Sequence, residues 1–193
     1  MGKVIFNNSM SLDGFVAGPN DEVDSLFRWY ASGNTEVSLP GTNKVFKVSR
    51  VSAEYIRAAW PTYGAMVTGR RLFDLTKGWG GNPPLGVHHF VVTHRDTPAW
   101  VTEDWPFTFV LEGVEHAVRE AKRRAGDKHV ALSSATIMRQ CLRAGLLDEL
   151  HLDVVPVLLG AGVRLFGDEP ANLERTRVVE APDVTHLQFR VVK

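Results

Sequence analysis

The sequence predicts an α/β protein with a mainly parallel sheet and antiparallel strands towards its C-terminal end. Short apolar segments at 65–68, 90–93 and 129–132 read as buried strands, and helical or polar segments separate them. This alternation is typical of a parallel sheet with crossover connections. From Leu150 onward, strand-like segments follow one another without intervening helices, which favours antiparallel pairing.

Composition bounds the class of protein. The 193 residues are 44% hydrophobic, which suits one domain with a sizeable core, so we expect a single domain over residues 1–193. The 22 basic and 22 acidic residues balance, which argues against nucleic-acid binding driven by bulk charge. One cysteine excludes an internal disulfide, and no apolar run suits a membrane span or a secretory signal. We therefore expect a cytoplasmic protein without membrane or nucleic-acid partners.

The first third of the chain predicts these elements in order. Residues 3–6 form a short apolar run and predict a buried strand, and the turn-rich segment 11–21 predicts a loop. Apolar residues at helical spacing predict a short helix over 23–30. Residues 33–44 are polar and predict an irregular surface segment, and a helix is expected over 49–60.

The remaining elements follow the same logic. A helix is expected to open at 69–74, another covers 114–125, and a third opens at 133–136 with an apolar face that includes Cys141. The basic run within 114–125 is typical of a solvated helix face. The expected tail strands are centred on 150–154, 164–166, 175–179 and 186–192.

Polar residues follow three of the predicted strands, and ligands of open α/β sheets bind outside such carboxyl ends. The first turn contains Thr68, Gly69, Arg70 and Arg71. Its glycine allows close approach of the backbone, the amides of the helix start favour an anion, and two guanidinium groups suit a phosphate monoester. Because a 2′-phosphate distinguishes NADP from NAD, the turn favours NADP. The alternative is an ordinary helix start with two surface arginines.

The other two ends predict further contacts with a phosphorylated cofactor. Thr93 and His94 offer a hydroxyl and an imidazole, which suit the adenosine phosphate. A small-residue turn opens the helix after the third strand and suits a pyrophosphate, although an ordinary N-cap has the same composition. That turn consists of Ser133, Ser134, Ala135 and Thr136.

The first loop is the candidate substrate side. Asp13-Gly14 is a strong turn signal, and a turn alone would explain it. The functional alternative places Asp13 or Ser11 near the substrate as catalytic residues. The histidines show no metal-ligand spacing, and Cys141 has no activating base nearby, so neither a metal site nor a cysteine nucleophile is expected.

Four stretches, in this order, carry a family resemblance: 11–18, 67–73, 144–150 and 154–166. With them the chain resembles the dihydrofolate reductase-like superfamily. More closely, it resembles bacterial proteins similar to the reductase domain of the bifunctional riboflavin-biosynthesis deaminase-reductase. The resemblance covers the chain nearly from end to end.

The resemblance implies a three-layer α/β/α fold, NADPH as hydride donor, and a homodimer. It implies a reductase of a pterin- or pyrimidine-like heterocycle, or of a related carbonyl or imine. For such a reductase, Asp13 or a bound water is the candidate proton source. It places the turns at 68–71 and 93–94 beside the adenosine phosphates, and 133–136 at the pyrophosphate. The residues that it places against the nicotinamide are Val16, Ala17 and Gly18.

Two positions depart from the family pattern. Ser133-Ser134 stands where the family usually has two glycines, and Leu132 stands where the riboflavin-pathway reductases have an acidic residue. These departures keep two alternatives open. One is a catalytically inactive, dimeric nucleotide- or metabolite-binding module, and the other is a purely structural dimer that associates through its tail strands.

Overall fold

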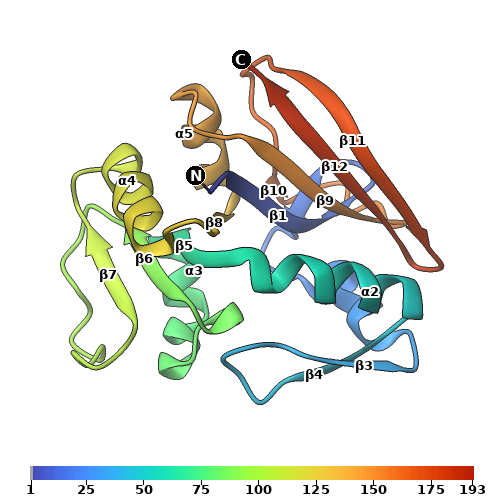
Figure 1. Ribbon diagram of the computed structural model, residues 1–193, viewed down its shortest axis with the longest axis horizontal. Helices are drawn as coiled ribbons and strands as arrows, with labels where there is room; N and C mark the ends of the chain where they lie inside the picture. Colours follow the sequence, from blue (N-terminus) through green and yellow to red (C-terminus); the bar gives the residue numbers. More distant parts are fainter. Residues whose placement is uncertain (1) are drawn as a thin grey trace.

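The computed structural model describes residues 2–193, which fold around an eight-stranded sheet of order β11-β12-β9-β1-β8-β5-β6-β7 (Figure 1). Its strands are β1 (Val4–Ser11), β5 (Tyr63–Gly69), β6 (His88–Val92), β7 (Phe107–Val110), β8 (His129–Ser133), β9 (Glu149–Val155), β11 (Asn172–Ala181) and β12 (Val184–Val192). Six neighbouring strands, from β9 to β7, run parallel. All their carboxyl ends therefore lie at one edge of the sheet.

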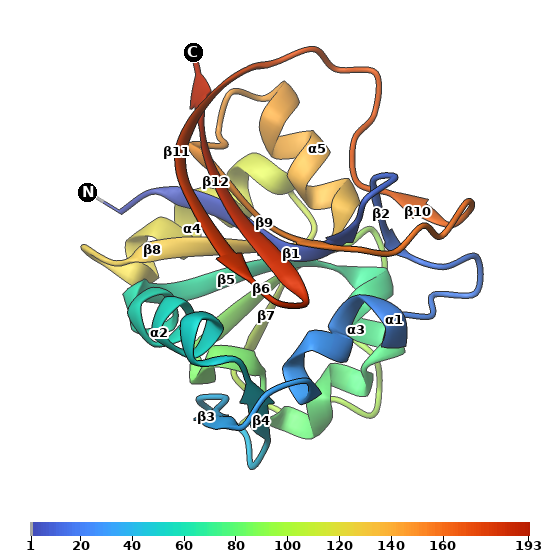
Figure 2. The same ribbon diagram turned by 90° about the vertical axis from the view of Figure 1, so that its right-hand side faces the viewer.

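Helices cover both faces of the sheet, which confirms the predicted α/β class. Figure 2 shows α4 and α5 on one face and α1, α2 and α3 on the other. The helices are α1 (Asp24–Phe27), α2 (Arg50–Ala59), α3 (Arg70–Leu75), α4 (Val114–Ala125) and α5 (Ala135–Arg143). The α4 and α5 face buries the main apolar core, because alternate strand residues such as Val67 and Leu132 point towards it.

The C-terminal strands differ in part from the prediction. β11 and β12 pair antiparallel, and β12 pairs antiparallel with β9, as expected. β9 itself, however, runs parallel to β1, because α5 supplies the crossover that returns the chain to the same edge. The expected strand at 164–166 is shorter: β10 (Val163–Arg164) pairs with β2 (Phe15–Ala17) outside the main sheet.

Four short strands were not predicted, and one of them, β2, lies in the expected loop 11–21. Residues 33–44, expected to be irregular, contribute to an antiparallel hairpin of β3 (Thr35–Ser38) and β4 (Val45–Val48). Its inward side chains, Val37 and Val48, pack against α2 in a second apolar core. β7 was not predicted either, because its four residues follow a proline-containing polar segment. The predicted helix at 23–30 is α1 followed by a 3-10 turn, Arg28–Ala31.

Among residues 2–193, none of the helices is long and apolar enough to cross a membrane.

Candidate functional site

The first and third predicted turns meet at the carboxyl edge of the sheet. β5 and β8 are neighbours, and Thr68 lies opposite Ser133 in their parallel register. Beyond this pair, a β-carbon built on Gly69 would lie 2.9 Å from Ser134 Oγ. The starts of α3 and α5 therefore approach each other closely, and the absence of a side chain at Gly69 permits this approach.

Two hydroxyls beside Gly69 lack internal partners. Thr68 Oγ1 and Ser134 Oγ are buried and have no hydrogen-bond partner within the described part of the chain. Ser134 is the N-cap of α5 at φ 84° and ψ 140°, and its side chain does not bond the helix amides. The first amides of α5 are therefore free to bind an anion, and an orphaned hydroxyl lies beside them. These features fit a phosphate group. Ala135 is buried at this helix start, whereas Thr136 is exposed.

The guanidinium group of Arg70 makes its hydrogen bonds within the protein. Its Nε donates to Asp74 Oδ1 at 2.7 Å, and its NH1 group donates to Thr93 Oγ1 at 3.3 Å and to the carbonyl of Asp96 at 2.8 Å. The side chain is only 13% exposed. Arg70 thus joins the start of α3 to the loop after β6, which brings Thr93 to the first turn.

Arg71 and His94 remain at the surface. Arg71 is 73% exposed and pairs at 2.7 Å with Asp21 of the first loop. His94 is exposed on the loop that Arg70 anchors. An exposed ion pair contributes little to stability, so Arg71 can exchange Asp21 for an incoming phosphate at low cost. The pair also shows that the first loop lies beside α3.

Asp13 holds two loops together. Its carboxylate accepts hydrogen bonds from Ser11 Oγ at 2.6 Å, from the Leu159 amide at 3.1 Å and from the Gly160 amide at 2.7 Å. These donors, the Ser11 hydroxyl above all, lower the pKa of Asp13 to about 2. Ser11 is fully buried, and its hydroxyl also accepts from the amide of Phe15. The carboxyl group is therefore ionised at neutral pH.

Replacing Asp13 with asparagine is expected to remove a pH-dependent part of stability. A carboxyl group whose pKa is lowered by folding stabilises the protein above its unfolded value, 3.8, and this stabilisation is lost as pH falls to about 2. The difference in urea midpoint between wild type and Asp13→Asn should thus be largest above pH 4 and shrink towards pH 2. A difference that stays constant over this range would contradict the role of Asp13 as an ionised clamp.

The residues that were expected to border the nicotinamide lie in β2, a strand that neighbouring parts of the protein bury. Val16 and Ala17 of β2 are 7% and 9% exposed. β10 covers β2 closely, because a β-carbon on Gly162 would lie 2.1 Å from the Ala17 carbonyl oxygen. Gly18 donates its amide to the Glu22 carbonyl and ends the strand in a turn. Access to β2 is therefore through its backbone edge and the turn at Gly18.

A family model, the RibD C-terminal domain, matches residues 2–187. The chain belongs to the RibD C-terminal domain family. The resemblance inferred from the four motifs is thereby confirmed. The search of curated proteins found no match.

Solved structures show the same fold as this RibD C-terminal domain protein. One is a protein named for riboflavin biosynthesis from Shewanella sp. PV-4, with a TM-score of 0.74, 19% identity and 100% of each chain covered. Dihydrofolate reductase from Enterococcus faecalis, complexed with NADP(H), has a TM-score of 0.62 and 12% identity, and the match covers 100% of this chain and 98% of that one.

RibD from Acinetobacter baumannii has a TM-score of 0.67 and 14% identity, and the match covers 100% of this chain but 58% of that one. This RibD C-terminal domain protein therefore spans just over half of that longer chain.

A buried polar network on the α2 face was not predicted. His186 of β12 shares a hydrogen bond of 2.7 Å with Asp153 Oδ1 through Nδ1, and one of 3.0 Å with Ser52 Oγ through Nε2. Tyr55 stacks on the imidazole at 4.1 Å, and Trp29 meets it edge-on at 5.3 Å. The order serine, histidine, aspartate is that of an acyl-transfer triad. Ser52 is 1% exposed, however, so the network braces β9, β12 and α2 in this family member.

Two residues of the central strand are further candidates that the sequence analysis did not single out. Asn7 and Asn8 lie in the middle of β1 and are half-buried, whereas Val4 to Phe6 are fully buried. They follow directly on the register pair of Phe6 and Leu132, and therefore lie beside the end of β8. Consecutive polar residues in an otherwise apolar central strand are the signal that could have identified them.

Proposed function

We propose that the protein is an NADPH-dependent reductase of a small planar heterocycle, pterin- or pyrimidine-like, or of a related carbonyl or imine. The observation that carries the proposal is the close approach of Gly69 to Ser134, beside which lie two unpartnered hydroxyls and the free amides of α5. Membership of the RibD C-terminal domain family and the NADP(H) complex of the E. faecalis reductase support the choice of cofactor.

Each proposed cofactor contact follows from the positions of these turns. Ser134, Ala135 and Thr136 would hold the pyrophosphate through the start of α5. Arg71, with Thr93 and His94 nearby, would hold the 2′-phosphate. Val16, Ala17 and Gly18 would border the nicotinamide, and the bound cofactor would supply the hydride. The protein's contribution is then orientation of donor and acceptor, and exclusion of water between them.

The proton that balances hydride transfer requires a separate source. The low pKa of Asp13 leaves its carboxyl group ionised at neutral pH, and its oxygens accept three hydrogen bonds. We propose that Asp13 and Ser11 keep the substrate-side loop in shape, and that a water admitted at half-buried Asn7 or Asn8 delivers the proton.

Replacing Arg71 with glutamine tests the cofactor assignment. Wild type is expected to bind NADPH at least tenfold more tightly than NADH, because a guanidinium–phosphate contact is worth about 1.5–3 kcal/mol. Arg71→Gln should abolish this preference while leaving NADH binding unchanged. Calorimetric titration of each protein with both cofactors measures the effect.

Arg50→Gln is the matched control, because Arg50 also begins a helix and pairs with a carboxylate, at Glu54. It should keep the wild-type preference. A preference for NADPH that survives in Arg71→Gln would reject the assigned role of Arg71.

The second candidate is a binding module without turnover. Its support is the pair of serines in the pyrophosphate turn, together with a clamped Asp13 that leaves the first loop without a protonated acid at neutral pH. A screen of pterin, pyrimidine and carbonyl acceptors with NADPH distinguishes the two. Cofactor oxidation with any acceptor favours the reductase, and binding without oxidation favours the module.

We propose that the protein is a homodimer. Leu173 and Val178 of β11 and Val192 of β12 are 39%, 40% and 52% exposed, so the tail ribbon presents apolar side chains to solvent. Sedimentation equilibrium tests the proposal directly, and a monomer at micromolar concentration would reject it.

A further inference from the structure

A separate cavity of about 170 Å³ lies at the opposite end of the parallel strands from the proposed cofactor site. Tyr63, His129 and Glu149 line it and are the first residues of β5, β8 and β9. The C-terminal half of α2 and the β11–β12 ribbon contribute the remaining wall, including Tyr55 and Arg177. Because β5 has seven residues, this cavity lies about 20 Å from Gly69.

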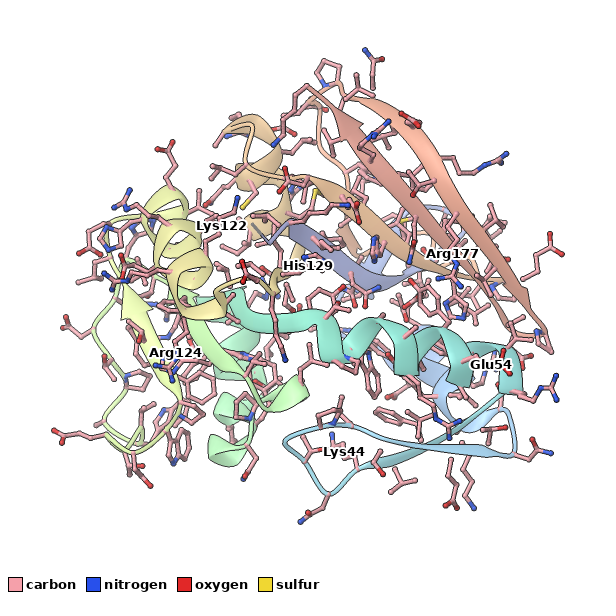
Figure 3. All side chains as sticks on the ribbon, viewed as in Figure 1. Lys44, Glu54, Lys122, Arg124, His129 and Arg177 are labelled. Carbon is pink, nitrogen blue, oxygen red and sulfur yellow. The ribbon has the colours of Figure 1, made fainter. Side chains whose placement is uncertain are left out.

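Two residues of the wall, His129 on β8 and Arg177 on β11, can donate hydrogen bonds to a ligand. The Lys3 amide donates to His129 Nδ1 at 3.1 Å, so the proton of a neutral His129 lies on Nε2 and makes that atom a donor. Arg177 lies over the ring of Tyr55, with 5.8 Å between its Cζ and the ring centroid, and no carboxylate within 4.0 Å pairs with it in the described chain. Figure 3 shows His129 and Arg177 on the same side of α2.

The cavity's carboxylate is already neutralised. Glu149 accepts from Lys3 Nζ at 2.5 Å through one oxygen and from His151 Nε2 at 2.9 Å through the other. Burial lowers the pKa of His151, so this imidazole is neutral at pH 7 and donates its Nε2 proton to Glu149. The charges of Lys3 and Glu149 cancel each other, so the charge left at the cavity is that of the Arg177 guanidinium.

We propose that this cavity binds a small carboxylate whose body is flat and apolar. Arg177 would receive the carboxylate group, and the ring of Tyr55 with the methyl group of Ala59 would contact the body. The volume matches, because a cavity of about 150 Å³ accommodates a benzene ring. The ligand does not reach Gly69, so the site is distinct from that of the proposed reaction.

Benzoate is the probe, with benzamide as its neutral isostere. Isothermal titration of the wild-type protein without NADPH should show one benzoate site per chain and at least tenfold weaker binding of benzamide. Arg177→Gln should weaken benzoate binding at least tenfold. Arg175→Gln is the matched control, since Arg175 lies on the same strand but does not line the cavity, and it should bind benzoate as wild type does.

A second variant tests whether the ligand needs the volume of the cavity, independently of the charge of Arg177. Ala59→Leu places a larger side chain in the cavity and should abolish benzoate binding while circular dichroism confirms the fold. Absence of benzoate binding to wild type, equal binding of benzamide, or unchanged binding in Arg177→Gln would each overturn the proposal. These measurements need no cofactor, so their failure leaves the proposed reductase function untouched, and failure of NADPH binding leaves the carboxylate site untouched.

Discussion

Replacing His186 with alanine is expected to lower the free energy of unfolding by about 3–5 kcal/mol, because it leaves Asp153 buried without its hydrogen-bond partner and removes a packed ring. Asp153 is 3% exposed and would lose the 2.7 Å hydrogen bond from His186. Tyr55 and Trp29 would lose the ring between them. Urea unfolding at pH 7, followed by circular dichroism, measures the change.

Two companion variants make this prediction specific. Asp153→Asn keeps an oxygen that accepts from His186, so it should cost less than half as much as His186→Ala. His94→Ala removes an exposed imidazole and should change stability by less than about 0.5 kcal/mol. A loss below about 1 kcal/mol for His186→Ala would show that the network is not a brace between β12, β9 and α2.

Replacing Gly69 with leucine should raise the dissociation constant for NADPH by tenfold to a hundredfold. The backbone at this residue, φ −86° and ψ 151°, is open to any side chain, so the change requires only that Ser134 Oγ shift. The new side chain would occupy the space beside Ser134 Oγ, where the first β-carbon alone lies 2.9 Å away. Blocking charge-assisted bonds from the α5 amides to a phosphate costs about 1.5–3 kcal/mol, which sets the expected range.

Ser134→Gly should act in the opposite direction. Its φ of 84° lies in the left-handed region, where glycine is favoured over serine, and loss of the hydroxymethyl group makes room beside Gly69. NADPH should bind at least as tightly as to wild type, and Ser134→Gly should recover part of the affinity lost in Gly69→Leu. Wild-type NADPH affinity in Gly69→Leu would place the cofactor elsewhere.

Local patterns predicted much of the architecture. Alternating apolar strands and helix starts identify β5, β8, α4 and α5, because periodicity and turn composition depend on neighbouring residues. The hairpin β3–β4 escaped prediction because each strand has only four residues and only Val37 and Val48 are buried. The parallel direction of β9 depends on which strand it joins, and the composition of residues 149–155 does not encode that choice.

The candidate site likewise has a part that the sequence predicted and a part that it did not. Gly69 and the serines before α5 were identifiable as an anion-binding turn, since helix starts carry their own amides. The partners of the arginines were not, because Asp96 follows Arg70 by 26 residues and Asp21 precedes Arg71 by 50. The network of Ser52, Asp153 and His186 spans 134 residues and has no local signature.

The sequence by itself determined an α/β fold with polar turns at three strand ends and a place in a recognisable family. The tertiary structure alone decided which charged groups are free to meet a ligand, engaging Arg70 and Asp13 internally and leaving Arg71 at the surface. The physical reason is the separation along the chain of the groups that interact. Backbone conformation responds to side chains a few residues away, whereas the charge and hydrogen bonding of a site depend on groups that only the packed chain brings within a few ångströms.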